Sequence, residues 1–140
     1  MSQKIEAPML ADVDRIARQL IHANSILDDA LHASLDGSRK DLALIQRILD
    51  SKTIEPEAEY TLRALGMAFG RVFIEHHSGY DWWMVEDEEG RDPAIRFEKT
   101  WLLAFPETMI LKRIEDGETV DVHDLFEQLS KKMSELQSGP

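Results

Sequence analysis

The segment YDWWMVED, residues 80–87, decides the fold class of this chain. Aromatic and β-branched residues dominate it, and Gly79 before it and the acidic turn at 88–90 after it mark its ends, which predicts a β-strand. On the C-terminal side, Ala94–Phe97 and Thr100–Phe105 predict two more short strands. Because the links between these segments are far shorter than the roughly twelve residues of a parallel crossover, we expect a three-stranded antiparallel meander.

Helical periodicity flanks this meander on both sides. Apolar residues recur there at three- and four-residue steps, the spacing of one face of a helix. This spacing predicts helices over residues 8–35, 38–51, 56–78, 106–116 and 121–136. The order of helices, meander and helices predicts a single α+β domain over residues 1–140, and we expect its ends, 1–7 and 137–140, to be frayed.

Two glycines, Gly66 and Gly70, lie one turn apart inside the third predicted helix. Each costs about 1 kcal/mol relative to alanine in a helix interior, so we expect a compensating interaction. Close approach of another element to this face is the simplest compensation. Tight internal packing is therefore the preferred interpretation, with binding of a partner as the alternative.

The composition excludes several classes of protein. The chain has 27 acidic and 16 basic residues, a net charge of −11, and no cysteine, which rules out disulfide scaffolds, thiol catalysis and thiolate zinc sites. The acidic balance argues against nucleic-acid or anionic-membrane binding, because both favour clustered lysine and arginine. The longest apolar run, Trp101–Phe105, is too short for a membrane span or a signal peptide, so we expect a cytosolic protein.

The sequence carries no recognised catalytic, cofactor or metal motif. It has five histidines, and no two of them stand at the i, i+4 spacing of a helical metal site. It lacks the Gly-x-Ser-x-Gly nucleophile motif and the glycine-rich loops that cradle phosphates. We therefore expect no cofactor, no metal and no enzymatic activity.

Three motifs in the C-terminal half carry a family resemblance. They are Trp83-x-Val85-x-Asp87-Glu88-x-Gly90-Arg91-Asp92-x-Ala94, Phe105-Pro106-x-Thr108-Met109-Ile110-x-Lys112-Arg113, and Val120-Asp121-Val122-x-x-Leu125-Phe126. Together they resemble the bacterial family known as domain of unknown function 3806, over residues 56–129. The resemblance implies a bacterial source and a compact α+β unit. Because that family has no agreed activity, it assigns no role to any residue.

Two adjacent tryptophans in the first strand suggest a partner surface. Neighbouring strand residues face opposite sides of a sheet, and we assign Trp83 and Val85 to the core face. An aromatic side chain beside acidic groups is the composition of a binding hot spot for a basic protein. The predicted partner-binding residues are Trp82, Met84, Glu86, Asp87, Glu88 and Glu89. The alternative is that the first helix covers the Trp82 face, which would make Trp82 part of the core.

Charge distribution and the missing motifs lead to three functional hypotheses. Residues 80–140 contain 7 basic and 15 acidic residues, a net charge of −8, so acidity is concentrated there. The first hypothesis is a non-catalytic, acidic protein-binding module, such as an immunity or antitoxin-like protein that occludes a basic toxin domain. The second is a small hydrolase or transferase with His76 or His77 beside a carboxylate. The third is a homo-oligomer that packs through the Trp82 face or the Gly66/Gly70 face.

Overall fold

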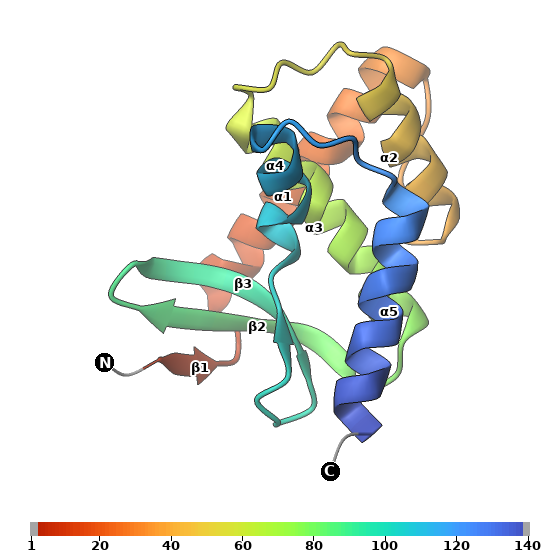
Figure 1. Cartoon of the computed structure of the whole chain (residues 1–140). Helices are drawn as coiled ribbons and strands as arrows, with labels where there is room; N and C mark the ends of the chain where they lie inside the picture. The colour runs from red at the N-terminus through yellow and green to blue at the C-terminus, as the bar shows by residue number, and fades with distance from the viewer. Residues whose placement is uncertain (1–2, 139–140) are drawn as a thin grey trace.

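The computed structural model describes residues 3–138 and contains every helix that the sequence predicts, together with a four-stranded sheet (Figure 1). The strands are β1 (Lys4–Glu6), β2 (Tyr80–Asp87), β3 (Gly90–Phe97) and β4 (Leu103–Ala104). The helices are α1 (Leu10–Leu31), α2 (Lys40–Asp50), α3 (Glu59–His76), α4 (Met109–Glu115) and α5 (Val122–Ser138), with a 3₁₀ turn at Pro106–Thr108 that leads into α4.

The sheet is antiparallel in the order β1-β2-β3-β4, so the predicted three-strand meander gains a fourth strand. The expectation of a frayed N-terminus is wrong for β1, which pairs with β2 and places Ile5 opposite Val85. Three residues are too few to show a sequence period, and an edge strand is held by backbone pairing that the side-chain pattern does not reveal. At the other end, residues 137 and 138 belong to α5, and residues 1–2 and 139–140 lie outside the described part.

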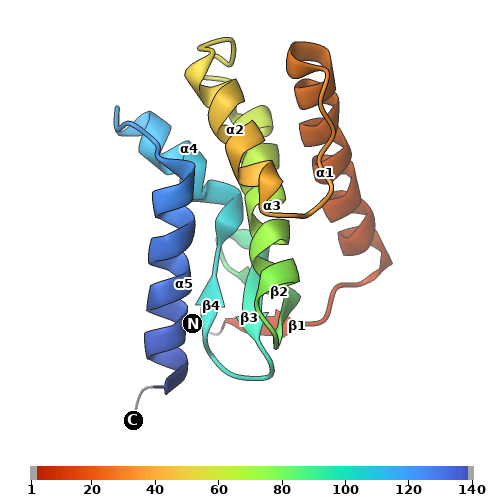
Figure 2. The ribbon, with the colours of Figure 1, turned by 90° about the vertical axis from the view of Figure 1, so that its right-hand side faces the viewer.

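Helix α3 is the centre of the apolar core. Its residues Leu62, Leu65, Phe69, Val72 and Phe73 are buried, and it packs against α1, α2, α4, α5 and the 3₁₀ turn. Figure 2 shows α1 and α5 on either side of α2 and α3, with the strands in the lower half of the view. No helix within residues 3–138 is both long enough and apolar enough to cross a membrane.

The two glycines of α3 allow the 3₁₀ turn to lie directly on the helix backbone. A Cβ atom at position 66 would lie 2.3 Å from the carbonyl oxygen of Pro106 and 3.0 Å from that of Glu107. At position 70 it would lie 2.7 Å from Pro106 Cγ and 2.8 Å from Trp82 Cη2. The prediction of close internal packing at Gly66 and Gly70 is therefore confirmed.

The helices cover the opposite face of β2 from the one assigned by sequence. Met84 is fully buried and packs with Ile16 of α1 and Met67 of α3. Trp82 is half-buried and packs against this cluster and against the main core. The assignment of Trp82 and Met84 to an exposed face is thus wrong, and the alternative, that α1 covers this face, is right.

The other face of β2 also carries packed side chains. Trp83 is half-exposed there, and the guanidinium of Arg96 lies 4.4 Å from the centre of its ring. Val85 and Ala94 lie on the same face and are buried. Both faces of the strand therefore carry packed apolar residues, which is why strand alternation alone does not identify the side that the helices cover.

Replacement of Gly66 by alanine should destabilise the protein by about 1–3 kcal/mol, the usual cost of overpacking, because backbone atoms of the 3₁₀ turn cannot move aside as a flexible side chain can. Urea unfolding measures this change. Ser25→Ala, on an exposed position of α1, is the control and should change stability by less than about 0.5 kcal/mol. A Gly66→Ala protein as stable as the wild type would show that the 3₁₀ turn can pack on α3 without this close contact.

Replacement of Trp82 by alanine should cost about 3 kcal/mol of unfolding free energy, because it opens a cavity between the two apolar clusters. The matched control is Trp101→Ala. Trp101 is 76% exposed, so its loss should change stability by less than about 0.5 kcal/mol. Equal losses in the two variants, compared by urea unfolding, would contradict the packing described for Trp82.

Candidate functional site

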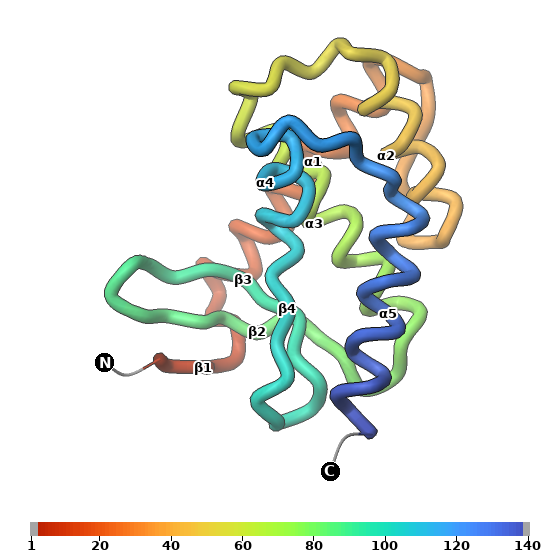
Figure 3. Tube along the Cα trace, viewed as in Figure 1, coloured from red at the N-terminus to blue at the C-terminus, as the bar shows by residue number. Residues whose placement is uncertain are grey.

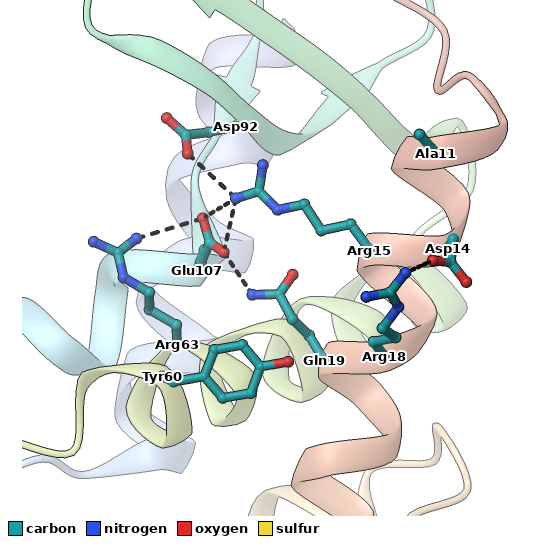
Figure 4. Close-up of a pocket in the computed structure, with 9 residues that line it drawn as sticks. All are labelled: Ala11, Asp14, Arg15, Arg18, Gln19, Tyr60, Arg63, Asp92 and Glu107. Atoms are coloured by element: carbon teal, nitrogen blue, oxygen red, sulfur yellow. Dashed lines mark hydrogen bonds and ion pairs between the residues drawn. The ribbon is translucent and has the colours of Figure 1, made fainter.

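A pocket opens between α1 and α3, bounded by β3 and by the 3₁₀ turn (Figure 4). It has a cavity volume of about 500 Å³. Its lining is rich in charged and polar side chains: Ala11, Asp14, Arg15, Arg18, Gln19, Tyr60, Arg63, Asp92 and Glu107. Ligand sites are usually concave and mostly apolar with a few convergent polar groups, so this pocket is more polar than most.

Glu107 lies deepest in this pocket, with 3% of its surface exposed. Gln19 Nε2 donates to Glu107 Oε2 at 2.6 Å, and Arg15 Nη2 donates to the same oxygen at 3.2 Å. Arg63 Nη1 lies 3.5 Å from Glu107 Oε1. Two guanidiniums thus neutralise a carboxylate that would be costly to bury alone.

The Glu107 carboxylate also fixes the two arginines that surround it. Arg15 donates through Nη1 to the Arg91 carbonyl at 2.7 Å and through Nη2 to Asp92 at 3.4 Å. Arg63 donates through Nε to Glu59 at 3.2 Å. Arginines held by several partners lose little further freedom when they bind a ligand, so the pocket presents oriented donors.

The outer part of the pocket is more exposed. Arg18 pairs there with Asp14, one turn before it on α1. Tyr60 is half-exposed, and its ring lies 4.8 Å from the ring of His22. Farther in, Gln19 Oε1 is buried and has no hydrogen-bond partner among residues 3–138. The pocket therefore offers cationic donors together with one unpaired acceptor.

A second charged cluster adjoins the pocket and centres on Arg91 of β3. Its guanidinium pairs with Glu6 of β1 and Glu86 of β2, and it donates to Asp12 of α1 at 2.6 and 3.0 Å. These hydrogen bonds lower the pKa of Asp12 from 3.8 to about 2, against the opposing effect of desolvation, and they lower the pKa of Glu6. The same contacts raise the pKa of Arg91. One guanidinium thus connects the N-terminal segment to the hairpin.

Sequence reasoning missed the pocket entirely. Arg15 and Gln19 stand at i, i+4 on α1, which places them on one side of the helix, but this spacing is common in solvent-exposed helix faces. Glu107 follows Pro106, where an acidic residue in a first helical turn is expected for dipole reasons alone. Neither signal indicates that the three side chains converge.

The predicted partner-binding residues are not one surface in the structure. Trp82 and Met84 face the helices, as described above, and Glu86 binds Arg91. Residues 87–89 are exposed at the end of the β2–β3 hairpin, which extends away from α5 (Figure 3). This acidic hairpin end (residues 87–89) is the part of the predicted set that remains accessible.

The most exposed large apolar residues include several on the outer side of α1. Leu10 is 87%, Val13 53% and Ile21 67% exposed, and Ala17 is also exposed. Their spacing of three to four residues places them along one side of the helix. We refer to Leu10, Val13, Ala17 and Ile21 as the α1 stripe.

The histidines do not form a metal site, since residues 3–138 contain no group of three or more histidine, aspartate or glutamate side chains placed to hold a metal ion. His77 Nε2 lies 2.9 Å from Ser130 Oγ, and burial lowers the pKa of His77. His76 Nδ1 lies 2.9 Å from the Val72 carbonyl oxygen. Both histidines line a cavity of about 340 Å³ whose lining within residues 3–138 includes no carboxylate, and the charge of Glu127, outside that lining, opposes the lowering of the His77 pKa.

The Asp12–Arg91 contact predicts a specific dependence of stability on pH. Because the pKa of Asp12 is lower in the folded protein than the ordinary value of 3.8, the contact stabilises the fold above that pH and is lost as the pH falls towards about 2. Asp12→Asn should therefore flatten the decrease in unfolding free energy between pH 4 and 2 in urea titrations. Asp29→Asn, at an exposed position of α1, should keep the wild-type slope. Parallel curves for wild type and Asp12→Asn would contradict this prediction.

Three comparisons with known proteins complete the description. A crystal structure of a protein from Bacteroides thetaiotaomicron VPI-5482 is similar, with a TM-score of 0.84 and 16% sequence identity, over 92% of this chain and 47% of that one. This chain thus spans about half the length of that protein, and the similarity supports the fold alone. No curated protein matches the chain. Residues 41–126 match the family model described as Domain of unknown function (DUF3806), so the predicted resemblance is confirmed and the chain belongs to this family.

Proposed function

We propose that this protein is a non-catalytic protein-binding module whose contact surface combines the α1 stripe with the acidic hairpin end. The partner is a protein with a basic, amphipathic surface. The observation that carries the proposal is the α1 stripe itself, because exposed large apolar residues in a continuous row are characteristic of interaction sites. A concrete form is an immunity or antitoxin-like protein that occludes a basic toxin domain in the cytosol.

The N-terminal turn of α1, which carries Leu10 and Val13, is joined to the hairpin. Arg91 forms a strand pair with Glu86, the residue before the hairpin end, and binds Asp12, which is buried on the side of α1 away from the stripe. Asp14, also on the outer part of α1, lies beside the stripe and is paired with Arg18. An apolar centre with acidic groups at its edge is complementary to an apolar face edged with lysine and arginine.

The negative charge of the whole molecule favours a basic partner. The net charge is −11, and Asp87, Glu88 and Glu89 form no ion pair within residues 3–138. The attraction of opposite charges raises association rates and weakens as salt screens it. The affinity therefore depends on the stripe, and the rate of encounter depends on the acidic hairpin end.

Fluorescence anisotropy with a labelled leucine–lysine peptide that forms an amphipathic helix tests this proposal. Wild-type protein should bind this peptide at least about tenfold more tightly than a scrambled peptide of the same composition. The Leu10→Ser/Val13→Ser variant should weaken binding by about tenfold, as expected for loss of apolar anchors, whereas Leu136→Ser, at an exposed position of α5, should not. An Asp87→Asn/Glu88→Gln/Glu89→Gln variant should bind more slowly and depend less on salt.

Two outcomes would overturn the proposal. One is equal binding of the patterned and the scrambled peptide. The other is a wild-type dimer in sedimentation analysis that Leu10→Ser/Val13→Ser converts to monomer, since the stripe would then serve self-association. If the peptide result is positive, capture from lysate with the wild type and the double variant in parallel identifies the natural partner by its loss from the variant.

A further inference from the structure

Two adjoining cavities, of about 220 and 300 Å³, form a groove between α4 and α5, which lie beside β4 in Figure 2. The cavities are continuous because they share four lining residues, Met109, Arg113, Leu129 and Lys132. We propose that this α4–α5 groove binds a straight-chain fatty acid, whose carboxylate lies between Arg113 and Lys132. The site is separate from the proposed partner surface, which belongs to α1 and the hairpin end.

The cations of the α4–α5 groove are not neutralised by the protein. Lys112, Arg113 and Lys132 form no ion pair within residues 3–138, and no carboxylate of this part of the chain lines either cavity. Arg113 Nη1 donates to the Met109 carbonyl at 3.1 Å, and the other guanidinium nitrogens of Arg113 donate no hydrogen bond among the described residues. The groove therefore offers charge-assisted donors to a carboxylate, in a chain that otherwise has an excess of acidic groups.

The floor of the larger cavity is apolar and comes from three elements. It consists of Leu103 and Phe105 in and after β4, Met109 of α4, and Leu129, Met133 and Leu136 of α5. Methionine side chains are flexible and adapt to the shape of an apolar ligand. An inorganic anion would bind the cations but leave this floor in contact with water, so a ligand with a hydrocarbon chain fits the groove better.

The direction and the length of the hydrocarbon chain follow from the placement of these residues. Arg113 and Lys132 line both cavities, whereas the apolar residues near β4 line only the larger one, so the chain extends from the cations towards β4. Leu129 and Leu136 both line the larger cavity and are separated by about 10 Å along α5. An extended chain of about eight carbons, with bonds of about 1.5 Å, has a similar length.

The net charge of the protein provides a strict test of this assignment. At −11, the molecule as a whole attracts cations and repels anions. An alkylammonium ion with the same hydrocarbon chain is therefore favoured by the overall charge and opposed by the cations of the groove. Preference for the fatty acid over this ion reports the local charge of the groove.

Titration of ¹⁵N-labelled protein with sodium octanoate and with octylammonium chloride, at constant ionic strength and below micelle-forming concentrations, tests the proposal. Octanoate should cause saturable shifts of amide signals in β4, α4 and α5, and octylammonium should bind there at least about tenfold more weakly. Hexanoate should bind about tenfold more weakly than octanoate, because each buried methylene group tightens binding by up to about fourfold.

A matched pair of variants on α5 tests the contribution of the cations. Lys132→Gln removes one cation at an exposed position, so the fold should remain intact and octanoate binding should weaken by about threefold to tenfold. Lys131→Gln removes the same charge from the neighbouring exposed position, outside the groove, and should change octanoate binding by less than about twofold. Arg113→Gln should weaken octanoate binding by at least about tenfold.

Three results would each overturn the proposal: no saturable octanoate shifts in α4 and α5, equal binding of octanoate and octylammonium, or equal effects of the Lys131 and Lys132 variants. Equal binding of hexanoate and octanoate would overturn the role of the apolar floor. Tighter binding of an amphipathic leucine–glutamate peptide at the same amides would overturn the assignment to a fatty acid in favour of an acidic protein segment.

Discussion

Pro106 and Glu107 lie on the backbone of α3 because positions 66 and 70 have no side chain in the way. This contact brings the connection after the sheet onto the most buried helix of the fold. It also determines where Glu107 enters the interior, one residue after the proline that faces Gly70. The two glycines lower the stability of α3 as a helix. In return, they allow the Glu107 carboxylate of the 3₁₀ turn to lie between α1 and α3.

That carboxylate makes the interior dependent on charge pairing as well as on apolar packing. Arg15 joins the Glu107 cluster to the Arg91 cluster, because one of its nitrogens donates to the Arg91 carbonyl and another to Glu107. Arg91 in turn binds β1, α1 and β2. Apolar packing tolerates small sliding movements, but bonds between guanidiniums and carboxylates require particular distances and directions. The two clusters thus fix the position of α1 relative to the hairpin, which packing of Ile16 and Met84 alone would leave less well defined.

The sequence predicts those parts of the fold that depend on local patterns. The five helices and the strand at 80–87 follow from periodicity and bounding residues, and the doublet Gly66/Gly70 correctly indicates a close contact. The side of β2 that faces the helices was assigned wrongly, because Trp82 and Trp83 are equally apolar and both faces of the strand are packed. Strand β1 and the pocket could not be predicted for a related reason. They depend on residues brought together from distant positions, such as Arg15 and Glu107, 92 positions apart.

The distribution of arginines connects the interior to the character of the surface. Arg15, Arg63, Arg71 and Arg91 each pair with a carboxylate that is buried or half-buried, so a considerable part of the positive charge is directed inward. On the projecting hairpin, by contrast, Glu86 and Asp92 pair with arginines, but Asp87, Glu88 and Glu89 form no ion pair within residues 3–138. The hairpin end of the molecule is therefore more acidic than the composition, with its 16 basic residues, suggests. In the proposed function, this negative charge attracts the basic partner and the α1 stripe supplies the apolar contact.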